Sequence, residues 1–221
     1  KFKEFKTIIF DCDGVILNSN NVKTESFRKA FSSYKEDLVK EFISYHKSNG
    51  GISRYEKIKF FLENLAPKYN YVNESRNYNH LVNQYSSICI EALYNVEIAK
   101  GLKNLRNYNV KSNWLIISGG DQSELRNVFK FKKINDYFDG GIFGSPDKKI
   151  DILVREIENK NIQYPALFLG DSKLDYQVAN SQLINFIFIS QWTDFKEYKK
   201  FCEENNILHL KNISSIYDLD L

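Results

Sequence analysis

Residues 7–14 read TIIFDCDG, an apolar run followed by two carboxylates and a glycine. Continuous apolar residues of this kind form strands that are buried on both faces of a sheet. Asp11 and Asp13 would then stand at the tip of that strand, where each carboxylate makes it harder to ionise the other. A bound cation, or proton and phosphoryl chemistry, is the usual reason for such a pair. Gly14 allows the sharp turn that brings backbone groups close to a ligand.

Further short apolar runs follow, and helical patterns separate them. The runs occupy 114–117, 141–143, 166–169 and 186–189, with a possible edge strand at 207–210. Helices are expected over 121–131, 150–160, 175–181 and 194–205. Asp121 caps the first of these helices, with Glu124 at the capping-box position. Strands that alternate with helices predict an α/β fold, in which helices cover both faces of a parallel sheet.

The interval between the first and second runs is about a hundred residues, far longer than one crossover helix. It contains no convincing strand, and its patterns predict helices over 22–34, 38–49, 53–65 and 73–93. We therefore expect an all-helical domain at residues 18–94. The sheet domain would comprise residues 1–17 and 95–221, with hinges near 17–20 and 93–99.

Each polar motif of interest follows a predicted strand. Ser118-Gly119-Gly120 follows the second strand, Lys148 and Lys149 come after the third, and residues 170–175 (GDSKLD) follow the fourth. In open α/β sheets, ligands bind along the edge formed by the carboxyl ends of the strands. A lone Asp-x-Asp pair, a Ser-Gly-Gly turn or a lysine beside a helix is usually structural. Together, however, these motifs each follow a different strand and would lie along the same edge of the sheet, which indicates a functional site.

These residue types suit phosphoryl transfer. Asp11 can attack phosphorus and form an aspartyl-phosphate. Asp13 can donate a proton to the leaving oxygen and then accept one from the attacking water. Asp171 adds a carboxylate for Mg²⁺, which prefers oxygen ligands. Asp175 can hold a lysine or a metal-bound water, although it could also serve only as a favourable charge at a helix start.

The phosphate itself needs donors and a positive charge. Ser118 offers a hydroxyl, and the backbone N–H groups beside it, beginning with Gly119, suit phosphate oxygens at a helix start. A lysine ammonium would balance the phosphoryl charge. Two lysines are available, and we favour Lys149, with Lys148 as the alternative.

In these motifs the chain resembles the haloacid dehalogenase-like superfamily. The matching residues are Asp11-Cys12-Asp13-Gly14-Val15, Ser118, a lysine before Ile152, and Gly170-Asp171-Ser172 with Asp175. The resemblance implies a Rossmann-like core with an inserted helical cap of the C1 type. It also implies that Asp13 binds Mg²⁺ through its main-chain carbonyl, so that the expected metal set is Asp11, Asp13, Asp171 and Asp175. Two aspartates in the first motif favour phosphatases or phosphomutases over dehalogenases.

Residues 50–54 (GGISR) resemble the cap specificity loop of β-phosphoglucomutase-like members. Arg54 lies in the first turn of a predicted helix, an unfavourable position for a cation. Its guanidinium suits a carboxylate or a second phosphate, so we expect Arg54 to bind a substrate anion. The alternative is an ion pair with a nearby glutamate, such as Glu56 or Glu63. His46 and Lys57 are weaker candidates.

Composition limits the partners. The 31 Lys and Arg residues against 28 Asp and Glu give a net charge of only +3, which does not predict nucleic-acid binding. We see no apolar stretch of membrane-spanning length and no signal or transit peptide. Three scattered cysteines suggest a reducing, cytoplasmic environment. The oligomeric state is left open.

The leading hypothesis is a Mg²⁺-dependent phosphatase that hydrolyses a small phosphorylated metabolite through an aspartyl-phosphate. A phosphomutase of the β-phosphoglucomutase type is the alternative. Cleavage of a phosphonate, as in phosphonoacetaldehyde hydrolases, would require a cap lysine as a Schiff base. A non-catalytic binding module is disfavoured, because every expected catalytic residue is present.

Overall fold

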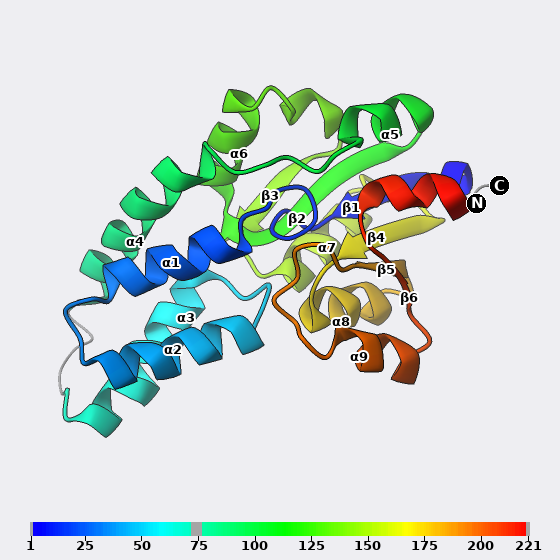
Figure 1. The fold of residues 1–221 in the computed structure, drawn as a ribbon. Helices are drawn as coiled ribbons and strands as arrows, with labels where there is room; N and C mark the ends of the chain where they lie inside the picture. The colour runs from blue at the N-terminus through cyan, green and yellow to red at the C-terminus, as the bar shows by residue number, and fades with distance from the viewer. Residues whose placement is uncertain (1, 72–76, 220–221) are drawn as a thin grey trace.

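The computed structural model describes residues 2–71 and 77–219. Its centre is a six-stranded parallel sheet in the order β3-β2-β1-β4-β5-β6 (Figure 1). The strands are β1 (Thr7–Phe10), β2 (Asn113–Asp121), β3 (Gly141–Ser145), β4 (Ala166–Gly170), β5 (Asn185–Ile189) and β6 (Leu208–Leu210). This confirms the α/β class and the parallel sheet.

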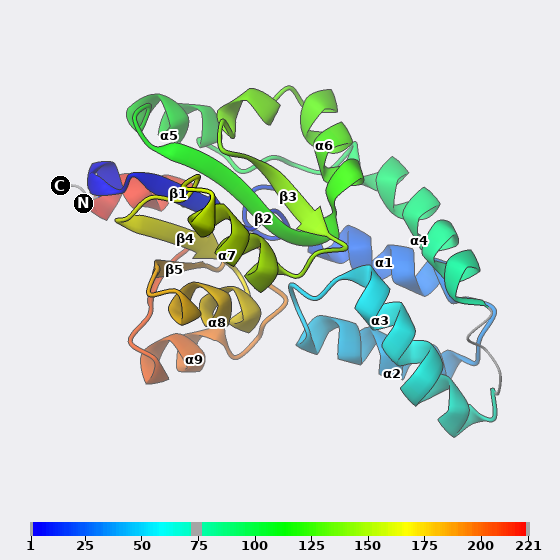
Figure 2. The same cartoon turned by 180° about the vertical axis from the view of Figure 1, so that it is seen from behind.

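Helices cover both faces of the sheet (Figure 2). They are α5 (Leu102–Tyr108), α6 (Gln122–Phe131), α7 (Lys149–Glu158), α8 (Lys173–Ser181) and α9 (Tyr198–Glu204). Ile152 of α7 and Val178 of α8 pack with Ile9 and Phe168 in one core cluster. Leu125 of α6 belongs to a second, larger cluster with the opposite sheet face. The strand order reverses between β1 and β4, which is where ligands bind in open α/β sheets.

Two details differ from the expected elements. Strand β2 continues through Ser118-Gly119-Gly120 to Asp121, so these residues lie within the strand rather than after it. The pairing of β2 with β3 shifts register between Ile117 and Asp121, which marks the same stretch as irregular. Helix α5 was not expected. It is only seven residues long and begins after Gly101 without a side-chain cap, so it carries few sequence signals.

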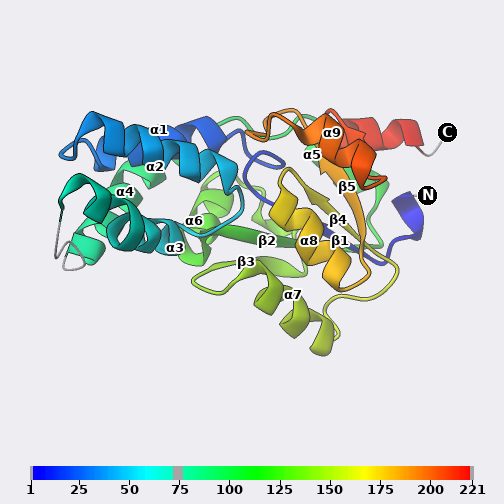
Figure 3. The same ribbon diagram turned by 90° about the horizontal axis from the view of Figure 1, so that it is seen from below.

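Between β1 and β2, the described residues form helices and no strand (Figure 3). The elements are α1 (Asn20–Ala30), α2 (Glu36–Ser48), α3 (Arg54–Phe60), a π-helical turn (Phe61–Leu65), a 3-10 turn (Ala66–Tyr69) and α4 (Tyr78–Leu93). The predicted start of the last helix at Asn73 falls outside the described residues. Ser53 caps α3 by accepting a hydrogen bond from the backbone N–H of Glu56.

Buried aromatic rings pack these helices together. The Phe27 ring lies 5.2 Å from that of Phe42, and Phe31 lies 4.6 Å from Phe61. All four rings are buried. Edge-to-face contacts of this kind add to the stabilisation from burial itself. These contacts hold the helices together, and the same cluster of buried residues continues to Phe10 and Trp114 of the sheet.

The two connections between this helical segment and the sheet run side by side. Leu17 and Ile98 form an antiparallel bridge, and the backbone N–H of Asn18 donates to the carbonyl of Glu97 at 3.0 Å.

Both chain termini lie at the end of the sheet away from helices α1–α4 (Figures 1 and 2). In the part of the chain that the structure describes, no helix combines the length and the apolar character that a membrane span requires. The three cysteines are free and buried.

Candidate active site

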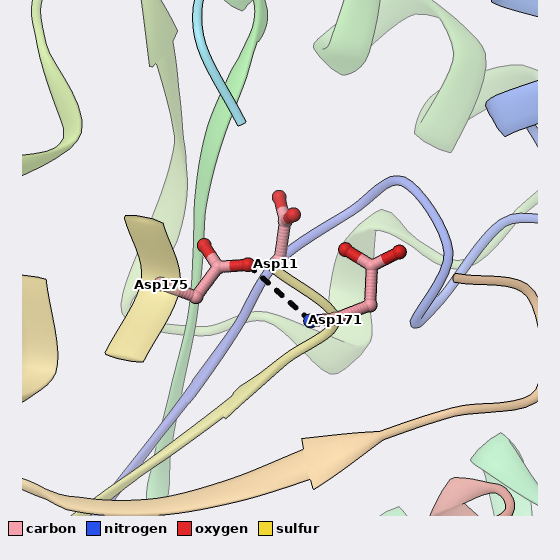
Figure 4. Close-up of side chains that lie close together, drawn as sticks. All are labelled: Asp11, Asp171 and Asp175. Carbon is pink, nitrogen blue, oxygen red and sulfur yellow. Dashed lines mark hydrogen bonds between the residues drawn. The ribbon is translucent and has the colours of Figure 1, made fainter. Parts of the chain in front are cut away.

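Three carboxylates meet at the sheet edge where the strand order reverses (Figure 4). Asp11 follows β1, Asp171 follows β4, and Asp175 lies in the first turn of α8. Each offers an oxygen within 4.8 Å of the others, and all three residues are buried. The sheet register explains the meeting, because Phe10 pairs with Leu169 and places the ends of β1 and β4 side by side.

Backbone contacts fix these aspartates. The N–H of Asp11 donates to the carbonyl of Leu169 at 2.9 Å. Ser172 and Asp175 form a reciprocal capping box at the start of α8. Gly14 has φ +77°, and a Cβ there would overlap the Asp171 carboxylate. Glycine at this position is therefore required both by the turn and by the close approach of Asp171.

Lys149 supplies the positive charge. Its Nζ lies 2.9 Å from Asp11 Oδ1 and 2.6 Å from Asp175 Oδ1, and the side chain is buried. Burial alone would lower the pKa of Lys149, but Asp11 and Asp175 raise it above the ordinary range. Lys148 is different, because its side chain is 65% exposed and pairs with Glu56. The structure thus places Lys149, and not Lys148, beside Asp11.

One lysine does not neutralise three carboxylates. Burial, and next the charge of Asp175, raise the pKa of Asp11 to about 7. Burial and the charge of Asp11 raise the pKa of Asp171 well above its usual value. Both carboxylate oxygens of Asp175 already accept hydrogen bonds, one from Lys149 and the other from Ser172. The oxygens that remain free therefore belong to Asp11 and Asp171. A divalent cation between them would remove the remaining repulsion, and carboxylate oxygens are suitable ligands for Mg²⁺.

The carboxylate of Asp13 is held apart from this cluster. Its oxygens accept from Ser19 Oγ at 2.5 Å and from the ammonium of Lys23. Burial would raise the pKa of Asp13, but Lys23 and Ser19 outweigh it and lower the pKa.

Neither Ser19 nor Lys23 was expected at the site, and nor was Asn20. Asn20 Nδ2 donates to Asp171 Oδ2 at 2.9 Å. The polar run Asn18-Ser19-Asn20 at the start of α1 is the one sequence signal for them.

The Ser118 segment contributes backbone groups to the cavity. Gly119 and Gly120 line it, whereas Ser118 is completely buried and its Oγ accepts from the N–H of Gly120 at 3.0 Å. A Cβ on Gly119 would overlap the carbonyl oxygen of Gly51, from the loop before α3. The sheet edge and the helical segment therefore touch at this point through two glycines.

Arg54 does not present a free guanidinium. It is buried and forms two hydrogen bonds with Glu124 of α6, at 2.5 and 2.6 Å. It also donates to Ser86 Oγ at 2.7 Å, and its guanidinium lies 4.7 Å from the centre of the Tyr85 ring. The expected partner was a substrate anion, with Glu56 or Glu63 as the alternative. The observed partner is instead Glu124 of α6, which follows strand β2.

A cavity of about 440 Å³ lies between the sheet edge and the helices. Asp11, Asp13 and Asp171 line its sheet side, and Lys23, His46 and Lys57 are among the residues on its helical side. A cavity of this size suits a small metabolite. His46 and Lys57 are both buried, although their side chains are polar.

The family model for haloacid dehalogenase-like hydrolases matches residues 5–181, which is most of the chain. The chain belongs to this family. None of the curated proteins matches this hydrolase in sequence.

Solved structures share the fold of this haloacid dehalogenase-like hydrolase. A predicted phosphoglycolate phosphatase from Haemophilus somnus has a TM-score of 0.74 at 15% identity, with 99% of each chain covered. A haloacid dehalogenase-like hydrolase from Streptococcus pneumoniae has a TM-score of 0.65 at 18% identity, covering 99% of this chain and 100% of that one. CbbY from Rhodobacter sphaeroides in complex with phosphate has a TM-score of 0.62 at 14% identity, covering 88% and 90%.

Hydrolases of this family generally use a divalent metal. In this member, the buried cluster of Asp11, Asp171 and Asp175 could bind one. The donor set is all oxygen, and the two carboxylates with raised pKa values are the ones that a cation would stabilise in the charged form. The residues present therefore fit such an ion.

Proposed function

We propose that this hydrolase is a Mg²⁺-dependent phosphatase that acts on a small phosphorylated metabolite through an aspartyl-phosphate at Asp11. One observation carries the proposal. Asp11 lies on the wall of the cavity, with Lys149 on one of its oxygens and Asp171 close by. This arrangement supports the proposal, because it would bring together a nucleophile, a cation that neutralises phosphate and a carboxylate that can bind a metal.

Lys149 and the backbone at Gly119 would hold the phosphoryl group over Asp11. An oxygen of Asp11 forms a bond to phosphorus as the bond to the leaving oxygen breaks. Asp13 would pass a proton from the Lys23 ammonium, which donates to its carboxylate, to the leaving oxygen, and would later take a proton from the water that hydrolyses the aspartyl-phosphate. Ser118 orients the segment that carries Gly119. Mg²⁺, when bound by Asp11, Asp171 and the carbonyl of Asp13, would neutralise phosphoryl charge, with Asp175 positioning Lys149.

We also propose that residues 18–94 are a cap that shields this reaction, and that residues 1–17 and 95–221 form the catalytic core. Contacts at the N-terminus of α3 support this assignment. Tyr55 Oη donates to Asp121 Oδ2 at 2.8 Å, and Arg54 pairs with Glu124. With this helix docked against α6, the cap lies over the carboxylate cluster and reduces the access of bulk water.

Phosphate release from a panel of phosphate esters, with Mg²⁺ or with EDTA, tests the proposal. We expect release that depends on Mg²⁺ and that falls at least a thousandfold in Asp11→Asn. Asp151→Asn is the matched control, because Asp151 is exposed on α7. An Asp11→Asn enzyme with full metal-dependent activity would rule out the aspartyl-phosphate. Isomerisation of a hexose phosphate without phosphate release would show a phosphomutase instead.

A further inference from the structure

Lys57 of α3 differs from the other buried cations of the site. Lys23 pairs with Asp13, Arg54 with Glu124, and Lys149 with Asp11 and Asp175. Lys57 is 3% exposed and lines the cavity, yet no carboxylate lies within ion-pair distance of it among the residues described. A buried ammonium without an acidic partner is costly, so its presence requires a reason.

The neighbours of Lys57 hold it in place without neutralising it. Its Nζ lies 2.9 Å from His46 Nδ1 and 3.3 Å from the His46 carbonyl oxygen. Because the ammonium donates to Nδ1, the imidazole proton is assigned to Nε2, which lies 3.1 Å from Thr24 Oγ1. The Phe27 ring, 4.9 Å from the imidazole centre, closes the other side. Two contacts thus use two of the three N–H groups of Lys57.

We propose that Lys57 binds a second anionic group of the substrate, a carboxylate or a further phosphate, on the helical side of the cavity that Asp11 also lines. This inference rests on the proposed phosphatase function and specifies its substrate class. The substrate would be a small phosphate ester that carries another negative charge.

The charges around Lys57 favour such a ligand. Burial, and next the charge of Lys23, lower the pKa of Lys57 to about 7 against the opposing effects of Asp13 and Asp194. An anion placed beside Nζ would accept its remaining N–H and favour the charged ammonium. The sequence had suggested Arg54 for this role, but Glu124 already neutralises that guanidinium. Lys47 and Lys173 also line the cavity but are exposed, so among the described residues Lys57 is the buried cation of the lining that has no carboxylate within ion-pair distance.

Matched pairs of substrates test this assignment. 2-Phosphoglycolate and 2-hydroxyethyl phosphate differ in a carboxylate, and propane-1,3-diol bisphosphate and monophosphate differ in a phosphate. We expect the wild type to prefer one anionic member by at least tenfold in kcat/KM, and the preferred pair identifies the anion. In Lys57→Met, the ratio of kcat/KM values within the preferred pair should fall at least tenfold, because KM for the anionic member rises. Lys57→Arg should restore part of this ratio. Lys59→Met, an exposed lysine of the same helix, should keep the preference.

Two outcomes would overturn the assignment. One is a wild type that hydrolyses anionic and neutral partners equally well, and the other is a Lys57→Met enzyme with the preference of the wild type. If no compound releases phosphate, the phosphatase proposal fails by itself. Calorimetric titration with 2-phosphoglycolate and propane-1,3-diol bisphosphate then decides about Lys57, because equal affinity of both ligands for wild type and Lys57→Met would exclude the anion subsite.

Discussion

Arg54 and Glu124 form a buried, two-bond ion pair that joins helix α3 to helix α6, which packs on the sheet. The two residues are separated by 70 positions in the chain. The pair fixes the segment against the sheet at the edge where the carboxylates meet. It therefore bears on both the stability of the protein and the geometry of the cavity.

Glu124→Gln should lower the free energy of unfolding by about 3 kcal/mol, because it leaves the Arg54 guanidinium buried without a counter-charge. Urea denaturation measures the change. Glu63→Gln is the control, since Glu63 is exposed and lies 3.9 Å from Lys59. Arg54→Met combined with Glu124→Gln should cost less than the sum of the single changes. Equal stability of the Glu124→Gln and Glu63→Gln variants would contradict the expectation.

Lys149→Met should destabilise the metal-free protein at pH 8 by about 3 kcal/mol, because Asp11 and Asp175 lose their shared cation. Added Mg²⁺ should recover part of this loss by neutralising the carboxylates. Thermal unfolding with EDTA and with Mg²⁺ measures both effects. Lys148→Met, which removes an exposed side chain, should change stability by less than about 0.5 kcal/mol. Similar losses in the two variants would refute the assignment of Lys149.

Gly119→Ala should push the loop before α3 away from the sheet, because the new Cβ would overlap the carbonyl oxygen of Gly51. We expect a loss of about 1–3 kcal/mol in unfolding free energy and a raised KM. Gly50→Ala is the control, since a Cβ there meets its nearest neighbour, Ser172 Cβ, at 3.3 Å. Denaturation and steady-state kinetics of the two variants provide the comparison. The expectation fails if Gly119→Ala is the milder change.

Lys57 should make stability depend on pH in a defined direction. Because its pKa is about 7 in the folded protein and 10.5 ordinarily, the unfolded chain binds the extra proton between those values. The stability that this group contributes therefore rises with pH from 7 towards 10.5, by up to about 1.4 kcal/mol per pH unit. The charged or titratable groups that act on it are Lys23, Asp13, Asp194, Lys149 and His46.

Unfolding free energies of wild type and Lys57→Met at pH 6, 7.5 and 9 test this expectation. The stability advantage of the variant should shrink as the pH rises. Lys59→Met, with an exposed side chain, should differ from wild type by the same amount at each pH. A constant difference for Lys57→Met would show that the lysine keeps its ordinary pKa.

Local sequence patterns were sufficient to predict the sheet and its carboxylate edge. The apolar run of β1 and the turn at Gly14 are each determined by residues that are adjacent in the sequence, so both can be predicted from it. Parallel pairing of β1 with β4 then brings Asp11 and Asp171 together. The end of β2 was predicted less well. The sequence of Ser118-Gly119-Gly120 is typical of a turn. Pairing with β3 resumes at Asp121, however, so strand β2 extends through these three residues.

The contacts between the helices and the sheet could not be predicted in this way. Glu124 is distant from Arg54 in sequence, so only Glu56 and Glu63 suggested themselves as partners. The sequence around Lys57 contains no pattern that would distinguish a buried lysine from an exposed one. Its burial arises from the packing of α1, α2 and α3 around His46.

The bridge between Leu17 and Ile98 makes the helical insertion modular. The chain leaves the sheet and returns to it through two paired segments, so the ends of the insertion are already neighbours. A short turn could close the chain across this bridge, as in a β-hairpin, without moving β1 or β2. Helices of different length and sequence could therefore be exchanged at this junction while the carboxylates of the sheet edge keep their positions.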